Sequence, residues 1–198
     1  HITGGGNYAH FKKTLRDYRE PGYLISMDIH DFKIINSICG VIKGDETLKN
    51  IWRCIEKSLT SKDLAGHINA DRFAIYCRCD DKDEVIECIH KIGEGLKDIT
   101  EALKIPNIIP YYGISHWKHG KKVEEAYSEA NFAKNQVKER KDISYQFYSH
   151  EDTLKILENR AMEDEFAGAI SNGQFEIWYQ PKYNPVDNKL VGAEALVR

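Results

Sequence analysis

The chain has 198 residues, which is enough for one domain of ordinary size or one domain and part of another. Hydrophobic residues make up 41% and charged residues 30%, a balance typical of a globular protein and not of a disordered or fibrous one. The formal net charge of −3 gives no support to a nucleic-acid-binding surface. No apolar run approaches the roughly 18 residues of a membrane span, and no signal peptide is visible.

The first half of the chain predicts a strand, a helix and a hairpin. Residues 23–29 form an apolar run that ends in acid and reads as a strand. Over residues 44–59, apolar side chains recur at the helical period of 3.6. The stretch "GHINADRFAIYCRCD", residues 66–80, predicts two short strands around a tight turn at 69–72.

The next elements complete a pattern of alternating strands and helices. We expect a helix over 83–101, a strand over 107–115, a helix over 123–139 and a strand over 143–149. Pro110 suggests an irregularity or an edge position in its strand, because proline cannot donate a ladder hydrogen bond. This order predicts an α/β (α+β) sheet covered by helices, close to the split βαβ arrangement.

Near residue 150 the pattern changes. Residues 151–173 predict a long acidic helix with Asn172 and Gly173 as its stop signal. The remaining residues read as two strands joined by a turn at 184–188. We therefore expect one domain over 1–150 and a second, incomplete element over 151–198.

The five cysteines are odd in number and irregularly spaced, at positions 39, 54, 77, 79 and 88. No CxxC motif is present, so metal binding by cysteine is disfavoured against packed, reduced thiols. Reduced thiols favour a cytoplasmic setting.

Four segments, "ITGGGNYAHF", "MDIHDFKIIN", "GVIKGDETL" and "INADRF", occur in an order that resembles the GGDEF family of diguanylate cyclases over residues 2–148. The final stretch, "FEIWYQPKYNPVDNKLVGAEALVR", resembles the start of an EAL domain, the cyclic-di-GMP phosphodiesterase. The resemblance implies a nucleotide-cyclase-like, ferredoxin-like sheet of mixed and mainly antiparallel strands flanked by helices. It also implies a C-terminal helix and a β-hairpin that belong to an incomplete EAL barrel.

The resemblance implies a metal-dependent GTP site. Asp28 matches the family's metal-binding aspartate, and Asp71 matches the acid in the third position of the hairpin signature. These two carboxylates could hold one Mg²⁺ against the triphosphate, since Mg²⁺ needs only one or two carboxylates besides phosphate oxygens. The alternative for Asp28 is a strand-end acid in water.

The hairpin tip departs from the family in ways that predict the loss of cyclase activity. Asn69 and Ala70 replace paired glycines, and Ala70 adds a Cβ where the nucleotide would pass, although Asn69 can adopt a left-handed turn conformation. Arg72 replaces a catalytic glutamate, and a guanidinium can neither accept a proton nor bind Mg²⁺. His30 replaces a second acid. We therefore assign no catalytic residue.

The resemblance keeps the base-binding side of the site. Asn36 and Asp45 match the pair that reads guanine, where a carboxylate accepts from the N1–H and N2–H₂ groups. Asp45 could instead favour a helix N-terminus, and Asn36 could be an ordinary turn residue.

The phosphate-facing side is also kept in part. Lys33 and Lys138 match phosphate-facing lysines, and backbone amides around Phe32 would contribute. Each lysine alone would more often be a surface residue. Arg72 has two possible interpretations. It arose by neutral drift after activity was lost, or it pairs with a triphosphate and replaces part of the missing metal charge.

In the EAL-like stretch, Gln180 and Glu194 match a substrate-proximal and a metal-binding residue, and Arg198 matches a phosphate-contacting arginine. Two strands cannot form the catalytic face of an eight-stranded barrel, so this chain is not expected to hydrolyse cyclic-di-GMP. We expect exposed apolar surface at Trp178, Val191 and Leu196, with a tendency to self-association or a homodimer.

The sequence thus predicts an inactive GGDEF-like regulatory module that binds GTP, with Mg²⁺ as a possible companion. The module would belong to a bacterial, cytoplasmic GGDEF–EAL signalling protein whose full-length form hydrolyses cyclic-di-GMP. A segment upstream of this chain could tether that protein to a membrane. The alternative is a structural or dimerisation module that binds no nucleotide.

Overall fold

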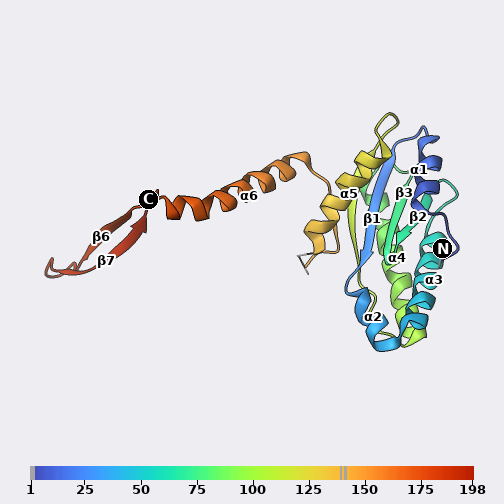
Figure 1. Cartoon of the computed structure of the whole chain (residues 1–198), viewed down its shortest axis with the longest axis horizontal. Helices are drawn as coiled ribbons and strands as arrows, with labels where there is room; N and C mark the ends of the chain where they lie inside the picture. Colours follow the sequence, from blue (N-terminus) through green and yellow to red (C-terminus); the bar gives the residue numbers. More distant parts are fainter. Residues whose placement is uncertain (1–2, 139, 141) are drawn as a thin grey trace. The chain divides into compact units, whose positions relative to one another are not determined.

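The structure is a computed structural model that describes residues 3–138, 140 and 142–198. The chain forms two compact units, His1–Tyr148 and Ser149–Arg198 (Figure 1). In the described part of the chain, no helix is both long and apolar enough to cross a membrane.

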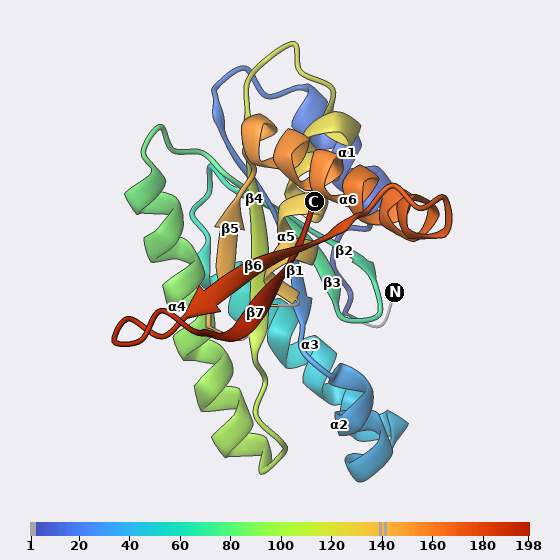
Figure 2. The ribbon, with the colours of Figure 1, turned by 90° about the vertical axis from the view of Figure 1, so that its left-hand side faces the viewer.

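A five-stranded mixed sheet is the centre of the first unit (Figures 1 and 2). Its strand order is β2-β3-β1-β4-β5, and only the β4–β5 pair is parallel. The strands are β1 (Gly22–Ile29), β2 (Leu64–Asn69), β3 (Arg72–Cys77), β4 (Pro110–Trp117) and β5 (Tyr145–Phe147). The predicted mixed sheet flanked by helices is confirmed.

Helices cover both faces of this sheet because each inner strand is apolar on both sides. On one face, Ile25 and Met27 of β1 pack with α3 (Val41–Ser58) and α4 (Lys82–Leu103). On the other face, Leu24 packs with α1 (Tyr8–Arg16) and α5 (Val123–Lys138). The alternation follows from the two-residue period of a strand. A short helix, α2 (Phe32–Cys39), joins β1 to α3.

Several elements differ from the sequence expectations. Neither α1 nor α2 was predicted, and α3 starts at Val41, three residues before the expected helix. The end of the helix expected over 123–139 lies outside the described residues. Pro110 is the first residue of β4, which lies between β1 and β5, so its expected edge position is wrong. Proline is tolerated at a strand's first residue because the ladder needs no donor there.

The second unit consists of α6 (His150–Ser171) and a two-stranded antiparallel sheet of β6 (Ile177–Tyr183) and β7 (Leu190–Val197). The Ser149 side chain caps α6 by accepting from the Asp152 amide. The helix ends before Gly173, whose φ is +64°. Within this unit Trp178 and Val191 are exposed as expected, whereas Leu196 is partly covered.

All five cysteines are free thiols. Cys77 and Cys79 both lie close to α4, and the Cys77 and Cys88 sulfurs are 3.4 Å apart. Burial raises the pKa of the Cys79 thiol to about 12, with the nearby Glu84 and Asp63 carboxylates adding to the effect. A thiol with such a pKa is mainly protonated and unreactive at neutral pH.

Candidate nucleotide-binding site

A cavity of about 560 Å³ opens at the C-terminal end of β1. It lies where the start of α2, the β2–β3 turn, the start of β4 and the last turns of α5 come together. Its lining residues are Asp28, Ile29, His30, Asp31, Phe32, Lys33, Ile34, Asp71, Arg72, Tyr111, Asn131, Lys134, Asn135 and Lys138. Six of the eight residues predicted for nucleotide and metal binding in the first unit are therefore in one place.

The other two predicted residues, Asn36 on α2 and Asp45 on α3, do not line this cavity. The glycine next to Asp45 brings the two helices together. A Cβ on Gly44 would come within 1.8 Å of the Asn36 side-chain oxygen. The Asn36 side-chain amide therefore occupies the space that a Cβ at position 44 would fill. Position 44 directly precedes Asp45 in the sequence.

Asp28 is paired with a lysine that the sequence reading missed. The Lys134 Nζ donates to the Asp28 Oδ2 at 3.1 Å, and Lys134 is only 2% exposed. The other carboxylate oxygen, Oδ1, accepts from the backbone N–H of Ile29 at 3.0 Å. Since charged side chains are almost never fully buried without a partner, this pair accounts for the burial of Lys134.

The close approach of α5 to the sheet delivers Lys134 to this position. A Cβ on Gly113 of β4 would meet the Ala130 carbonyl oxygen at 1.9 Å and the Lys134 backbone nitrogen at 2.2 Å. Helix and strand therefore touch backbone to backbone at Gly113. The Lys134 side chain therefore starts between α5 and the sheet, and its Nζ reaches Asp28 on β1.

Asp71 lies at the hairpin tip beside Asp28. Burial, together with the negative charge of Asp28, raises the pKa of the Asp71 carboxyl to about 6. A hydrogen bond between the two carboxyl groups acts in the same direction, because only a protonated Asp71 can donate it. The Arg72 guanidinium partly offsets this effect.

Two aromatic rings form the wall behind Asp28. The rings of His30 and Tyr111 lie with centroids 4.2 Å apart, and Lys134 Nζ is 5.9 Å from the Tyr111 ring centroid. Burial raises the pKa of the Tyr111 hydroxyl, and Asp28 adds to the effect. His30 thus contributes a packed ring where the family pattern has a carboxylate.

The hairpin tip carries backbone strain at Ala70. Its φ is +49°, in the left-handed region that glycine adopts without cost, whereas Asn69 ends β2 without a positive φ. The residue in the left-handed conformation is therefore Ala70, although the sequence had suggested Asn69 for it. The Ala70 carbonyl oxygen lies 2.7 Å from His67 Nε2, which helps to hold the turn.

The arrangement of these residues does not suit a divalent cation. Asp28 is already engaged through both oxygens, and a partner of its carboxylate is itself a buried cation. Among the described residues, no group of three or more His, Cys, Asp or Glu side chains gathers in a way that could hold a metal. The prediction that Asp28 and Asp71 hold Mg²⁺ stays a prediction that this geometry does not favour.

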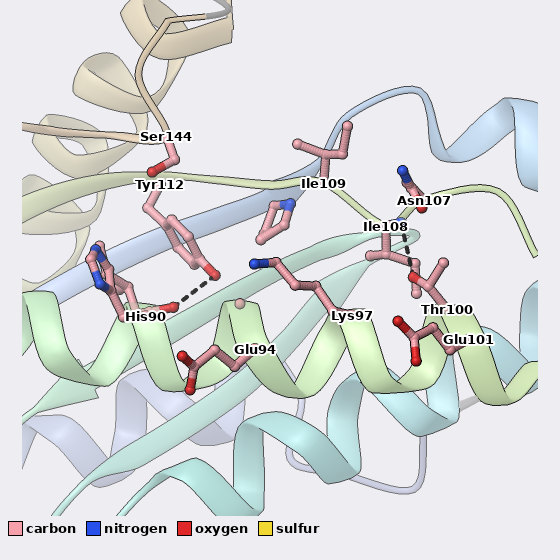
Figure 3. A pocket seen from close by; sticks show the side chains of 13 residues that line it. His90, Glu94, Lys97, Thr100, Glu101, Asn107, Ile108, Ile109, Tyr112 and Ser144 are labelled. Carbon is pink, nitrogen blue, oxygen red and sulfur yellow. Dashed lines mark hydrogen bonds between the residues drawn. The ribbon is translucent and has the colours of Figure 1, made fainter.

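A second cavity, of about 580 Å³, lies between α4 and the start of β4 (Figure 3). Lys97 and Tyr112 reach into it from the helix and the strand. The Tyr112 hydroxyl donates to the Ile89 carbonyl oxygen at 3.4 Å. None of the residues predicted for nucleotide or metal binding lines this cavity, so it is separate from the site at β1.

In the second unit, Gln180 of β6 lies directly opposite Glu194 of β7 in the strand register. Glu194 forms an ion pair with Lys182 at 3.0 Å. Arg198 lies over the ring of Trp178, 5.3 Å from its centroid. Gln180 and Glu194 are thus cross-strand neighbours, while Arg198 is engaged with an aromatic ring.

Residues 8–143 match the family described as diguanylate cyclase, GGDEF domain. The chain therefore belongs to the GGDEF family, whose domains generally bind GTP together with a metal. The fold agrees: the GGDEF domain of TpbB from Pseudomonas aeruginosa superposes with a TM-score of 0.67 at 22% identity, over 79% of this chain and 97% of that one.

Two of the relatives are named as enzymes of cyclic di-GMP. The chain is 26% identical to the cyclic di-GMP phosphodiesterase NbdA over 87% of its own length, and 22% identical to the bifunctional cyclase/phosphodiesterase MucR over 94%, both from Pseudomonas aeruginosa. It spans 22% and 27% of the lengths of these two relatives. The S helix–GGDEF–EAL structure of LapD from Vibrio cholerae, bound to cyclic di-GMP, covers 99% of this chain at 18% identity with a TM-score of 0.63.

Proposed function

We propose that the first unit is a regulatory module that binds a guanine nucleotide, GTP, and has no cyclase activity. The observation that carries the proposal is the division of the site. Lys33, Arg72 and Lys138 line one cavity, whereas Asp28 in the same cavity is paired with a buried lysine.

The phosphate-facing part of the proposal rests on three cations. Lys33, Arg72 and Lys138 all line the cavity, and all three are exposed to solvent. An exposed lysine or arginine at the rim of a cavity can reach a phosphate without losing a buried partner. Phe32 starts α2, so backbone amides at that helix end face the same space.

The proposed loss of catalysis follows from phosphoryl-transfer chemistry. Two triphosphates can react only if charge on the transferred group is neutralised and the attacking hydroxyl is activated. Arg72 can accept no proton, and Asp28 is held by Lys134. No other acid among the described residues joins Asp28 and Asp71 in a metal-binding group.

For the whole protein we propose a GGDEF–EAL architecture, with 1–150 as the degenerate GGDEF domain and 151–198 as the connecting helix and first two strands of an EAL barrel. The parent would be a cyclic-di-GMP phosphodiesterase, a proposal supported by the names of two relatives. We propose in addition that it is cytoplasmic and forms a homodimer. In that setting Gln180, Glu194 and Arg198 would join the catalytic face only when the other barrel strands are present.

Calorimetric titration with GTP and with ATP tests the proposal, and Gly44→Ala is its sharpest variant. The new Cβ collides with the Asn36 side-chain oxygen, which can swing away at little cost to stability. We expect saturable binding of GTP but not ATP, and at least about tenfold weaker GTP binding in Gly44→Ala and Asp45→Ala. Gly93→Ala on α4, whose Cβ would meet nothing within 4 Å, is the matched control.

A second candidate is an interaction module without nucleotide. It is favoured by four exposed apolar side chains at the α2–α3 corner: Ile34, Ile38, Val41 and Ile42. Contiguous exposed apolar surface of this kind often marks a contact with another protein. Absence of any heat with millimolar GTP, together with self-association that Ile38→Ser and Ile42→Ser abolish in analytical ultracentrifugation, would favour this candidate over the first.

A further inference from the structure

We propose that the buried Lys134 ammonium takes the place of a divalent cation at Asp28, so that this cavity accepts nucleotide phosphates without a metal ion. The exclusion of the cation stands on the geometry of Asp28 alone. The phosphate part rests on the proposed nucleotide binding.

The ammonium occupies the position from which a metal would bind Asp28. A Mg²⁺ ion lies 2.0–2.1 Å from its oxygen ligands. Lys134 Nζ is already 3.1 Å from Oδ2, and Oδ1 accepts from the Ile29 amide. A divalent cation on this carboxylate would therefore sit beside a fixed positive charge in a poorly solvated place, where like charges repel most strongly.

Lys134 cannot easily make way for such an ion. Its backbone is pressed against Gly113 of β4, and its side chain is 3% exposed. The Tyr111 ring lies below the ammonium group. Moving the side chain to solvent would break the ion pair with Asp28 and the contact with the Tyr111 ring.

The charges that remain favour an anion. Once Lys134 is paired with Asp28, the other cations that line the cavity are Lys33, Arg72 and Lys138. Against these three cations stand two further carboxylates of the lining, Asp31 and Asp71. The cavity thus supplies from its own side chains the positive charge that a metal ion would otherwise bring to a triphosphate.

Uptake of Mn²⁺ by the nucleotide-free protein, measured as loss of the free-ion signal in electron paramagnetic resonance, tests the exclusion. Lys134→Met removes the ammonium but keeps the length of the side chain. Asp28→Asn with Lys134→Met is the matched control, since it leaves the site without the carboxylate. We expect Lys134→Met to take up one Mn²⁺ at least about tenfold more tightly than the wild type or the double variant.

Two outcomes would overturn the exclusion: uptake by the wild type that the double variant loses, or equal uptake by Lys134→Met and the wild type. Circular dichroism checks that each variant is folded. If Lys134→Met does not fold, Mn²⁺ uptake by the wild type is compared with uptake by the double variant, which lacks both charges. A metal site at Asp28 in the wild type would be absent from the double variant, so this comparison still tests the exclusion.

Titration of the wild type with GTP in EDTA and in Mg²⁺ tests the phosphate part. We expect the two affinities to agree within about twofold. GTP binding that is lost in EDTA would overturn the proposal while leaving the proposed function intact. Absence of GTP binding under both conditions would instead remove the proposed function and this phosphate part, and the Mn²⁺ result would still decide whether Lys134 excludes a cation.

Discussion

At the scale of single residues, the site is defined by a pair that is 106 positions apart in the sequence. Asp28 could be recognised from the segment around it, but Lys134 lies in the middle of an amphipathic helix, where a lysine is normally exposed. The only signal that could have found Lys134 is its place on the apolar face of α5, between Ala130 and Val137. A search of the predicted helices for charged residues on an apolar face would have identified Lys134 as a candidate buried residue.

Ala70 offers a direct measure of strain at the hairpin tip. Since its φ is +49°, a Cβ is unfavourable there, and Ala70→Gly should raise the free energy of unfolding by about 1 kcal/mol. Urea denaturation at pH 7 measures the change. Ala74→Gly, in the interior of β3, should instead lower the free energy of unfolding, and a loss in both variants would contradict the strain at Ala70.

Asp71 predicts a pH dependence of stability with a definite sign. Its folded-state pKa of about 6 lies above the model value of 3.8, so the folded protein binds this proton more tightly than the unfolded chain does. The free energy of unfolding should therefore fall as the pH rises through 6 and should recover as the pH is lowered toward 4. In Asp71→Asn the free energy of unfolding should not show this fall with rising pH, because the side chain no longer ionises.

Thermal unfolding from pH 4 to pH 8 checks the prediction for Asp71. The melting temperature of Asp71→Asn should exceed that of the wild type above pH 6, and the gap should narrow on acidification. Asp142→Asn is a suitable control, because that carboxyl is fully exposed and its pKa is lowered by Arg140. A gap that widens as the pH falls would refute the assignment.

At the scale of helices and strands, patterns with a strong period were predicted correctly and short ones were missed. The helices over 44–59 and 83–101 correspond to α3 and α4, whose buried residues follow the helical period. By contrast, α1 and α2 have nine and eight residues and bury only two side chains each. Such helices depend on contacts with the rest of the fold, which periodicity does not report.

The contact between α5 and β4 predicts a large effect from one methyl group. Gly113→Ala would place a Cβ against the backbone of α5, which cannot move away as a side chain can. We expect the free energy of unfolding to drop by about 2–3 kcal/mol, as in other overpacked cores. Chemical denaturation measures it, with Gly93→Ala as the control that should be neutral or slightly stabilising. A drop below about 0.5 kcal/mol would contradict the contact.

At the scale of the whole chain, all residues of the two buried clusters lie in the first unit. Every residue of β6 is exposed within the second unit. Removal of residues 149–198 should therefore leave the unfolding midpoint of the first unit unchanged within about 2 °C. Differential scanning calorimetry of residues 1–148 beside the full chain checks this, and a large drop in the midpoint would show that the second unit supports the core.

The change of pattern near residue 150 predicted a two-part organisation, whereas the pairing at Asp28 and the left-handed Ala70 could be found only from the three-dimensional structure. Motif matching assigns residues to a family's roles one at a time. It does not report a contact made from elsewhere in the chain, such as that of Lys134, which changes what a matched residue can do.

The confinement of the core to the first unit has a consequence for synthesis on the ribosome. The chain emerges N-terminus first, and the last strand of the sheet, β5, ends at Phe147. Once that strand has left the exit tunnel, the nascent chain already contains every side chain that its core requires. The candidate site can thus form while α6 and the hairpin are still inside the tunnel or not yet translated, so folding of this unit does not wait for the remainder of the polypeptide.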